Sequence, residues 1–144
     1  MNNQLHQGLN KEVANLFVLF TKLHHFHWFV EGNQFFILHE KFEELYDEVN
    51  ELYDQFAERL ITIGGKPASK LSDYLKLTTL KETDNLDSNK MVGELLQDLK
   101  QLVKEFKELT SVSQELGDEQ TADLLISTVS SFEKHIWMFT AFNK

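Results

Sequence analysis

Residues 23–65 read LHHFHWFVEGNQFFILHEKFEELYDEVNELYDQFAERLITIGG, and this stretch decides the fold. After Gly32 and Asn33, apolar residues recur every three or four positions, which predicts one long amphipathic helix. We expect Asn33 to cap its start and Gly64 to stop it. The apolar positions are Phe35, Leu38, Phe42, Leu45, Val49, Leu52, Phe56, Leu60 and Ile63.

A second, polar pattern lies on the same predicted helix. His39 and Glu43 are four positions apart, as are Asp54 and Glu58, so each pair shares one face at a spacing that suits metal ligands. At about 1.5 Å of rise per residue, His39 and Asp54 are roughly 22 Å apart along the axis. One copy of the helix therefore cannot close both pairs around one ion. An antiparallel copy across a two-fold axis can, and symmetry then makes the site twice.

The preceding helix supplies a third candidate ligand. We expect this helix to run from about Leu5 to Glu31, with His27 on its apolar face. His27 lies six residues before Asn33 and His39 lies six residues after it, so an antiparallel hairpin brings the two imidazoles to one level. Taken singly, such a histidine is usually a core residue, and acids four apart usually mark a solvated face. Their convergence favours a metal site, whose imidazole and carboxylate ligands suit Fe(II) and also Zn or Mn.

Four runs carry a family resemblance: LHHFHWFVEG, FFILHEKFEELYDE, DQFAERLITIGGKP and EKHIWMF. Together they resemble the Dps family of small ferritin-like proteins. The resemblance extends over almost the whole chain. It implies an all-α fold, a ferritin-like four-helix bundle, and a hollow dodecamer of identical subunits. It also implies ferroxidase centres between two-fold-related subunits, which is the arrangement that ligand spacing suggests independently.

Carried over by position, the resemblance makes His27 and His39 ligands from one subunit. Asp54 and Glu58 become ligands from its neighbour. Glu43 falls where many members of the family carry an aspartate, and its extra methylene bears on the geometry at a second iron.

The resemblance implies that the protein is a ferroxidase that stores and detoxifies iron. Fe(II) would be oxidised, preferably by hydrogen peroxide, and Fe(III) kept inside the shell, which protects the cell from oxidative damage. Trp28 matches a tryptophan beside the family's centre that is credited with supplying an electron or intercepting radicals. Two alternatives stay open: a nucleoid-compacting DNA-binding protein, and a helical assembly protein with a vestigial metal site.

Composition bears on these alternatives. With 144 residues, 42% of them hydrophobic, we expect one domain over residues 1–144, and the absence of cysteine excludes disulfides and thiolate ligands. The net charge of −9 and the lack of Lys or Arg in the first ten residues argue against DNA binding. No signal sequence or apolar run of membrane length is present, so we expect a cytoplasmic protein without membrane contact.

The rest of the chain completes the expected bundle. Residues 68–87 form a connection with a short helix, long enough to cross over so that the second and third long helices run parallel. The third is expected to start after Asp87-Ser88, with Gly117 breaking it and Asp118 capping the fourth. No Glu-x-x-His occurs, which disfavours a conventional ferritin or di-iron oxygenase with its site inside one subunit.

An acidic corner precedes the fourth helix. The resemblance places Asp118, Glu119 and Asp123 around three-fold pores that admit ferrous ions, where symmetry triples each carboxylate. The alternative is that acids near a helix N-terminus cap it and favour its dipole.

Further acids follow the long helix at Glu40, Glu44 and Asp47. They either face the shell interior and seed ferric oxide or form an ordinary solvated helix face. His135 and Trp137 are interpreted as packing or subunit-contact residues. No role is assigned to His6, His24 and His25.

Overall fold

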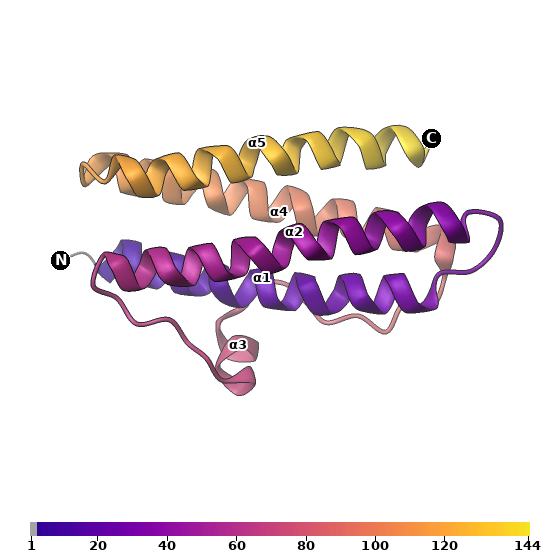
Figure 1. Ribbon diagram of the computed structural model, residues 1–144, viewed down its shortest axis with the longest axis horizontal. Coiled ribbons are helices and arrows are strands. Elements are labelled where there is room, and N and C mark those ends of the chain that lie inside the picture. The colour runs from indigo at the N-terminus through magenta and orange to yellow at the C-terminus, as the bar shows by residue number, and fades with distance from the viewer. Residues whose placement is uncertain (1–2) are drawn as a thin grey trace.

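The chain folds into a bundle of long helices with one short helix at its side (Figure 1). The structure is a computed structural model that describes residues 3–144; residues 1 and 2 of the expected domain lie outside this part. Within residues 3–144 it contains no strand and these helices: α1 (Asn3–Phe29), α2 (Phe35–Thr62), α3 (Leu71–Leu77), α4 (Ser88–Glu115) and α5 (Glu119–Phe142). The predicted all-α four-helix bundle is confirmed.

The four long helices form two hairpins, α1 with α2 and α4 with α5 (Figure 1). The segment that carries α3 returns along the bundle, so α2 and α4 run in the same direction. This is the predicted crossover, with its short helix packed against α1. Among the described residues, no helix combines the length and the apolar character needed to cross a membrane.

Phenylalanine rings fill the centre of the bundle. Phe26 on α1 and Phe42 on α2 have ring centroids 5.6 Å apart. Phe106 on α4 lies 5.4 Å from Phe56 on α2 and 5.6 Å from Phe132 on α5. All of these rings are fully buried, and burial of such a side chain contributes about 1.5–3 kcal/mol. The core therefore holds the two hairpins together.

Three glycines with left-handed backbone lie beyond the ends of helices. Gly32, Gly64 and Gly117 have φ angles of 98°, 93° and 75°, in the left-handed region that favours glycine. Beyond Gly117, the Asp118 carboxylate accepts a hydrogen bond from the backbone N–H of Thr121 at 3.0 Å. Asp118 is thus the N-cap of α5, as expected.

The turn between α1 and α2 differs from the prediction in detail. The backbone N–H of Phe35 donates to the Gly32 carbonyl oxygen at 3.1 Å, so Asn33 lies inside a tight turn. The residue that precedes α2 is Gln34, whose side chain makes no capping hydrogen bond. The prediction that Asn33 caps α2 is therefore wrong. α1 also ends two residues earlier than predicted, at Phe29.

A polar cluster ties the crossover to α1 and α4, and we call it the crossover anchor: Lys11, Glu12, Asn15, Thr79 and Glu105. The Asn15 side-chain amide donates to Glu12 at 2.9 Å and to Glu105 at 3.1 Å, and its oxygen accepts from the Thr79 backbone N–H at 2.8 Å. The Thr79 hydroxyl donates to Glu105 at 2.6 Å. The Lys11 ammonium lies 3.3 Å from Glu105.

The two carboxyl groups of the anchor have opposite pKa shifts. Burial, followed by the hydrogen bond and charge of Glu105, raises the pKa of Glu12 to about 9. Burial acts on Glu105 too, but hydrogen bonds from Glu12 and Thr79 and the charge of Lys11 outweigh it and lower the pKa of Glu105. At neutral pH, Glu12 is therefore protonated and Glu105 is ionised.

Candidate metal centre

His27 on α1 and His39 on α2 hold one another through backbone hydrogen bonds. The Nδ1 of His27 lies 2.7 Å from the His39 carbonyl oxygen, and the Nδ1 of His39 lies 2.8 Å from the His27 carbonyl oxygen. A carbonyl oxygen only accepts, so each Nδ1 carries a proton, and in the neutral imidazole the lone pair is then on Nε2. This is the arrangement that orients metal-binding histidines. The rings stack with centroids 3.7 Å apart, at 14°.

Glu43 completes a three-residue cluster. One of its carboxylate oxygens lies 3.8 Å from the Nε2 of His27. One ligand atom from each of His27, His39 and Glu43 lies within 4.8 Å of the other two, which is close enough to share a metal ion. The His27 side chain is 9% exposed and that of Glu43 is 52% exposed, so the cluster has a buried wall and an open side. Nitrogen and oxygen donors of this kind suit Fe(II), Zn(II) and Mn(II).

Aromatic rings surround the histidine pair. The Phe35 ring stacks on that of His39 with centroids 4.9 Å apart. The Tyr46 ring meets His27 nearly edge to face at 5.3 Å, and it also contacts His24, stacked at 3.8 Å, and Phe20, edge to face at 5.8 Å. Burial and the charges of Glu43 and Asp47 raise the pKa of Tyr46, so its phenol is neutral at physiological pH. No role for Tyr46 or His24 can be predicted from the sequence, because their contact depends on how α1 and α2 are rotated against each other.

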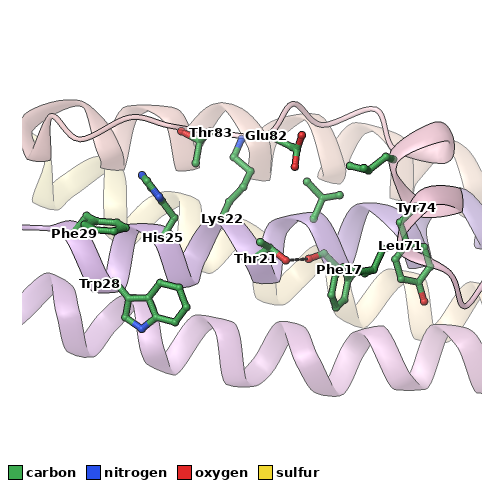
Figure 2. Close-up of a pocket in the computed structure, with 12 residues that line it drawn as sticks. Phe17, Thr21, Lys22, His25, Trp28, Phe29, Leu71, Tyr74, Glu82 and Thr83 are labelled. Atoms are coloured by element: carbon green, nitrogen blue, oxygen red, sulfur yellow. Dashed lines mark hydrogen bonds between the residues drawn. The ribbon is translucent and has the colours of Figure 1, made fainter.

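Trp28 lies close to this group of rings, at the end of an apolar groove. Its indole is 5.4 Å from the His24 ring, and the residue is 65% exposed. Figure 2 shows Trp28 extending from α1 toward α2, with Leu71 and Tyr74 of α3 at the other end of the groove. The groove encloses about 370 Å³. The redox role of Trp28 stays a prediction, and the structure gives the residue both access to solvent and ring neighbours.

Asp54 and Glu58 do not join the cluster of their own chain. Both are exposed on α2, and the His27, His39 and Glu43 cluster includes neither. This agrees with the distance argument, since His39 and Asp54 are separated by about four turns of one helix. Whether Asp54 and Glu58 complete the cluster of a second chain stays a prediction.

In the acidic corner, the Asp118 carboxylate has hydrogen-bond partners within the chain, whereas the other two carboxylates are exposed. Asp118 accepts from the Thr121 hydroxyl at 2.6 Å and lies 3.1 Å from the Arg59 guanidinium. Hydrogen bonds from Thr121 and the Arg59 charge lower the pKa of Asp118 against the opposing effect of burial. Asp118 therefore caps α5, whereas Glu119 and Asp123 are exposed. The pore assignment of all three stays a prediction.

The acids proposed to seed ferric oxide are all exposed on α2. Glu44 forms a surface ion pair with Lys41 at 3.2 Å, while Glu40 and Asp47 also face solvent. Both a role in seeding ferric oxide and an ordinary solvated helix face require exposed side chains, so the role of these residues stays a prediction.

The remaining histidines have structural partners. The Nε2 of His6 lies 3.1 Å from the Ile63 carbonyl oxygen, and the Nε2 of His25 lies 2.8 Å from that of Asn85. The Nε2 of His135 lies 2.9 Å from a carboxylate oxygen of Glu48, which joins α5 to α2. These contacts fasten helices and the crossover to one another.

Comparison with known proteins agrees with the fold. A family model of the ferritin-like domain matches residues 6–144, which defines the class of protein. The chain is 45% identical to DNA protection during starvation protein 2 of Bacillus anthracis, covering 99% of this chain and 98% of that relative.

Comparison with solved structures identifies the family within the ferritin-like class. The Dps from Bacillus brevis has a TM-score of 0.95 at 42% identity, with all of both chains covered. The Dps from Listeria innocua soaked with zinc has a TM-score of 0.94 at 40% identity, covering 96% of this chain and 94% of that one. The chain therefore belongs to the Dps family of ferritin-like proteins.

Proposed function

We propose that this protein oxidises Fe(II) with hydrogen peroxide and stores the ferric product inside a shell of identical subunits. The observation that carries the proposal is the histidine pair: backbone carbonyl oxygens hold both Nδ1 atoms, and one ligand atom from each histidine lies within 4.8 Å of a Glu43 carboxylate oxygen. Hydrogen bonds of this kind orient the histidines that bind metals in proteins.

The site is shared between two chains in this proposal. His27, His39 and Glu43 of one subunit face Asp54 and Glu58 of a two-fold-related subunit. The exposure of Asp54 and Glu58 supports this, as does the open side of the cluster. The resemblance to Dps proteins further implies twelve subunits in the shell, each a single domain, working in the cytoplasm.

The chemistry is a two-electron reduction. Two Fe(II) ions and one hydrogen peroxide, with two protons, give two Fe(III) ions and two waters, so no hydroxyl radical is released. The carboxylates favour the harder ferric product, and the histidines bind the ferrous substrate. Glu119, Asp123 and Asp118 would line the route in, and Glu40, Glu44 and Asp47 would receive the ferric ions for storage.

The experiment is the double variant Asp54→Ala with Glu58→Ala. We expect peroxide-driven oxidation, followed by ferric absorbance, to slow at least about tenfold, as for other losses in a metal site. Size-exclusion chromatography should show an assembled shell. The matched control, Glu51→Ala with Glu108→Ala, removes the same charge from exposed positions and should oxidise iron at the wild-type rate. A wild-type rate in the first variant would contradict the assignment.

The names of the relatives refer to DNA protection, which iron removal and DNA binding can each achieve. The net charge of −9 favours iron removal, because phosphate contacts require clustered Lys and Arg. A gel-shift assay at low salt checks this directly. We expect no retarded DNA at protein concentrations where iron is fully oxidised.

A further inference from the structure

The first part of the crossover is basic, although the chain as a whole is acidic. Residues 64–81 contain four of the 14 lysine and arginine residues and one of the 23 acids, which gives them a net charge of +3 in a chain of net charge −9. Figure 1 shows this segment at the side of the bundle, where it leaves α2 and leads to α3. A local concentration of positive charge attracts anions even when the net charge of the protein is negative.

Three of these lysines surround one hollow. Lys66, Lys70 and Lys76 line a hollow of about 490 Å³, which we call the lysine hollow. All three residues are exposed. The lysine and arginine ion pairs within residues 3–144 use other residues, namely Lys11, Lys22, Lys41, Arg59, Lys90 and Lys107. The three ammonium groups of the hollow are therefore available to a ligand.

Hydrogen bonds to α1 fix the backbone of the hollow. The Ala68 backbone N–H donates to the Asn10 side-chain oxygen at 2.8 Å, and the Ile63 carbonyl oxygen lies 3.1 Å from the Nε2 of His6. These contacts hold the chain on both sides of Lys66. Asn10 also lines the hollow, and its NH2 group makes no hydrogen bond within residues 3–144, so it can donate to a ligand. A preformed backbone lowers the cost of binding, because the segment need not be ordered by the ligand.

The residues of the hollow select for a compact anion of several charges. A lysine ammonium is a compact point charge with three donors, and it commonly binds phosphate. A chain of phosphate groups offers charged oxygens to all three lysines at once, whereas a single carboxylate cannot. The volume lies within the range of about 300–1,000 Å³ that is usual for small-molecule sites.

We propose that the lysine hollow binds a short chain of phosphate groups, as found in inorganic polyphosphate and in nucleoside triphosphates. This binding does not involve iron, so it is independent of the proposed function. The hollow is not a duplex DNA site, because it is concave and presents three lysines, whereas duplex binding needs a row of phosphate contacts along an extended surface.

The experiment is calorimetric titration of the metal-free, full-length protein with sodium tripolyphosphate at low salt. We expect the triple variant Lys66→Ala, Lys70→Ala and Lys76→Ala to bind at least about tenfold more weakly than the wild type, since each exposed charge contact contributes up to about 1 kcal/mol. The matched control, Lys100→Ala with Lys104→Ala and Lys134→Ala, removes the same charge from exposed positions of α4 and α5. It should keep the wild-type affinity.

A single substitution gives a test in the opposite direction. Asp73 lines the hollow and is the acid of residues 64–81, so its carboxylate repels a bound phosphate chain. Asp73→Asn should therefore bind tripolyphosphate about two- to fivefold more tightly than the wild type. Unchanged or weaker binding in Asp73→Asn would contradict the placement of the ligand between the lysines.

Adenosine triphosphate and citrate complete the set of probes. Adenosine triphosphate should bind at least as tightly as tripolyphosphate if a nucleotide is the natural source of the phosphate chain, and more weakly if polyphosphate is; either result supports the proposal. Citrate should bind more weakly than both. Three results would overturn the proposal: no binding of tripolyphosphate to the wild type, an equal loss of affinity in the control variant, or citrate binding as tight as that of tripolyphosphate.

Discussion

Two polar clusters lie in the same bundle, and they differ in whether their polar side-chain atoms all have hydrogen-bond partners within the chain. In the crossover anchor, both ends of the Asn15 amide and the Glu105 carboxylate make hydrogen bonds within the chain. In the metal cluster, backbone carbonyl oxygens hold the Nδ1 atoms of His27 and His39, and the Nε2 of His27 lies 3.8 Å from a Glu43 carboxylate oxygen without a hydrogen bond to it. Satisfied groups stabilise a fold, whereas groups held in place but left available can bind a ligand.

The largest effect should follow removal of a ligand from the metal cluster. We expect His39→Ala to weaken zinc binding at least about 100-fold in calorimetry, because deleting a ligand costs more than the 10- to 100-fold lost with a ligand's supporting partner. His6→Ala is the control, since His6 contacts the Ile63 carbonyl oxygen far along the chain from the cluster. Equal zinc affinity in His39→Ala and the wild type would contradict the assignment of His39 as a metal ligand.

The crossover anchor should instead respond in stability. Asn15→Ala leaves the buried Glu12, the partly buried Glu105 and the Thr79 backbone N–H without the hydrogen bonds that Asn15 makes, at a cost of about 2–4 kcal/mol. Urea unfolding measures this cost, and Gln97→Ala at an exposed position of α4 is the control. Zinc affinity of the folded variant should match the wild type. A change in zinc affinity without a change in stability would contradict the assignment of the crossover anchor to stability and not to metal binding.

The anchor also predicts how stability depends on pH. The pKa of Glu12 is about 9 in the folded protein, above its ordinary value, so between pH 4.5 and 9 the folded state holds a proton that the unfolded chain has lost. This group therefore makes the protein less stable as pH rises through that range. Glu12→Gln cannot ionise, so the wild-type Tm should fall relative to that of Glu12→Gln by at least about 5 °C between pH 6 and pH 9.

Glu108→Gln, at an exposed site on the same helix as Glu105, is the control and should follow the wild-type pH profile. Parallel profiles for wild type and Glu12→Gln would show that Glu12 does not carry its proton into the alkaline range.

A smaller effect separates the two readings of the acidic corner. Asp118→Ala should cost about 1–2 kcal/mol, as for other N-caps, while Asp118→Asn keeps an accepting oxygen and should cost less. If Asp118 only caps α5, Asp118→Asn should take up iron at the wild-type rate, whereas Glu119→Gln with Asp123→Asn should slow uptake. Slower uptake in Asp118→Asn would instead support a direct role in the pore.

Local sequence patterns were enough to predict most of the fold. The three-to-four spacing of apolar residues, with Gly64 and Gly117 as stops, predicted the long helices, because the periodicity and the left-handed glycines act over a few residues. The cap of α2 was missed, because Asn33 and Gln34 are adjacent polar residues. Which of them ends the turn depends on the hydrogen bond from Phe35 to Gly32.

The metal cluster was predictable for a similar reason. His27 and His39 lie at equal distances from one turn, so the hairpin alone brings them together. The contact of Tyr46 with His24 depends on the relative rotation of two helices, which no local pattern encodes. The burial of Glu12 could be predicted from the sequence, because Glu12 lies between Leu9 and Leu16 on the apolar face of α1. Its interaction with Glu105 could not, because the two residues are 93 positions apart in the chain.

The most direct test of the shared site is complementation between two inactive variants. One chain carries His27→Ala with His39→Ala and the other carries Asp54→Ala with Glu58→Ala, and the two are assembled at equal amounts. If each centre takes its histidines from one subunit and its acids from another, two-fold pairs of unlike chains contain one intact centre. Random pairing then restores about one quarter of the wild-type peroxide-driven oxidation. A mixture as inactive as its two components would contradict the account.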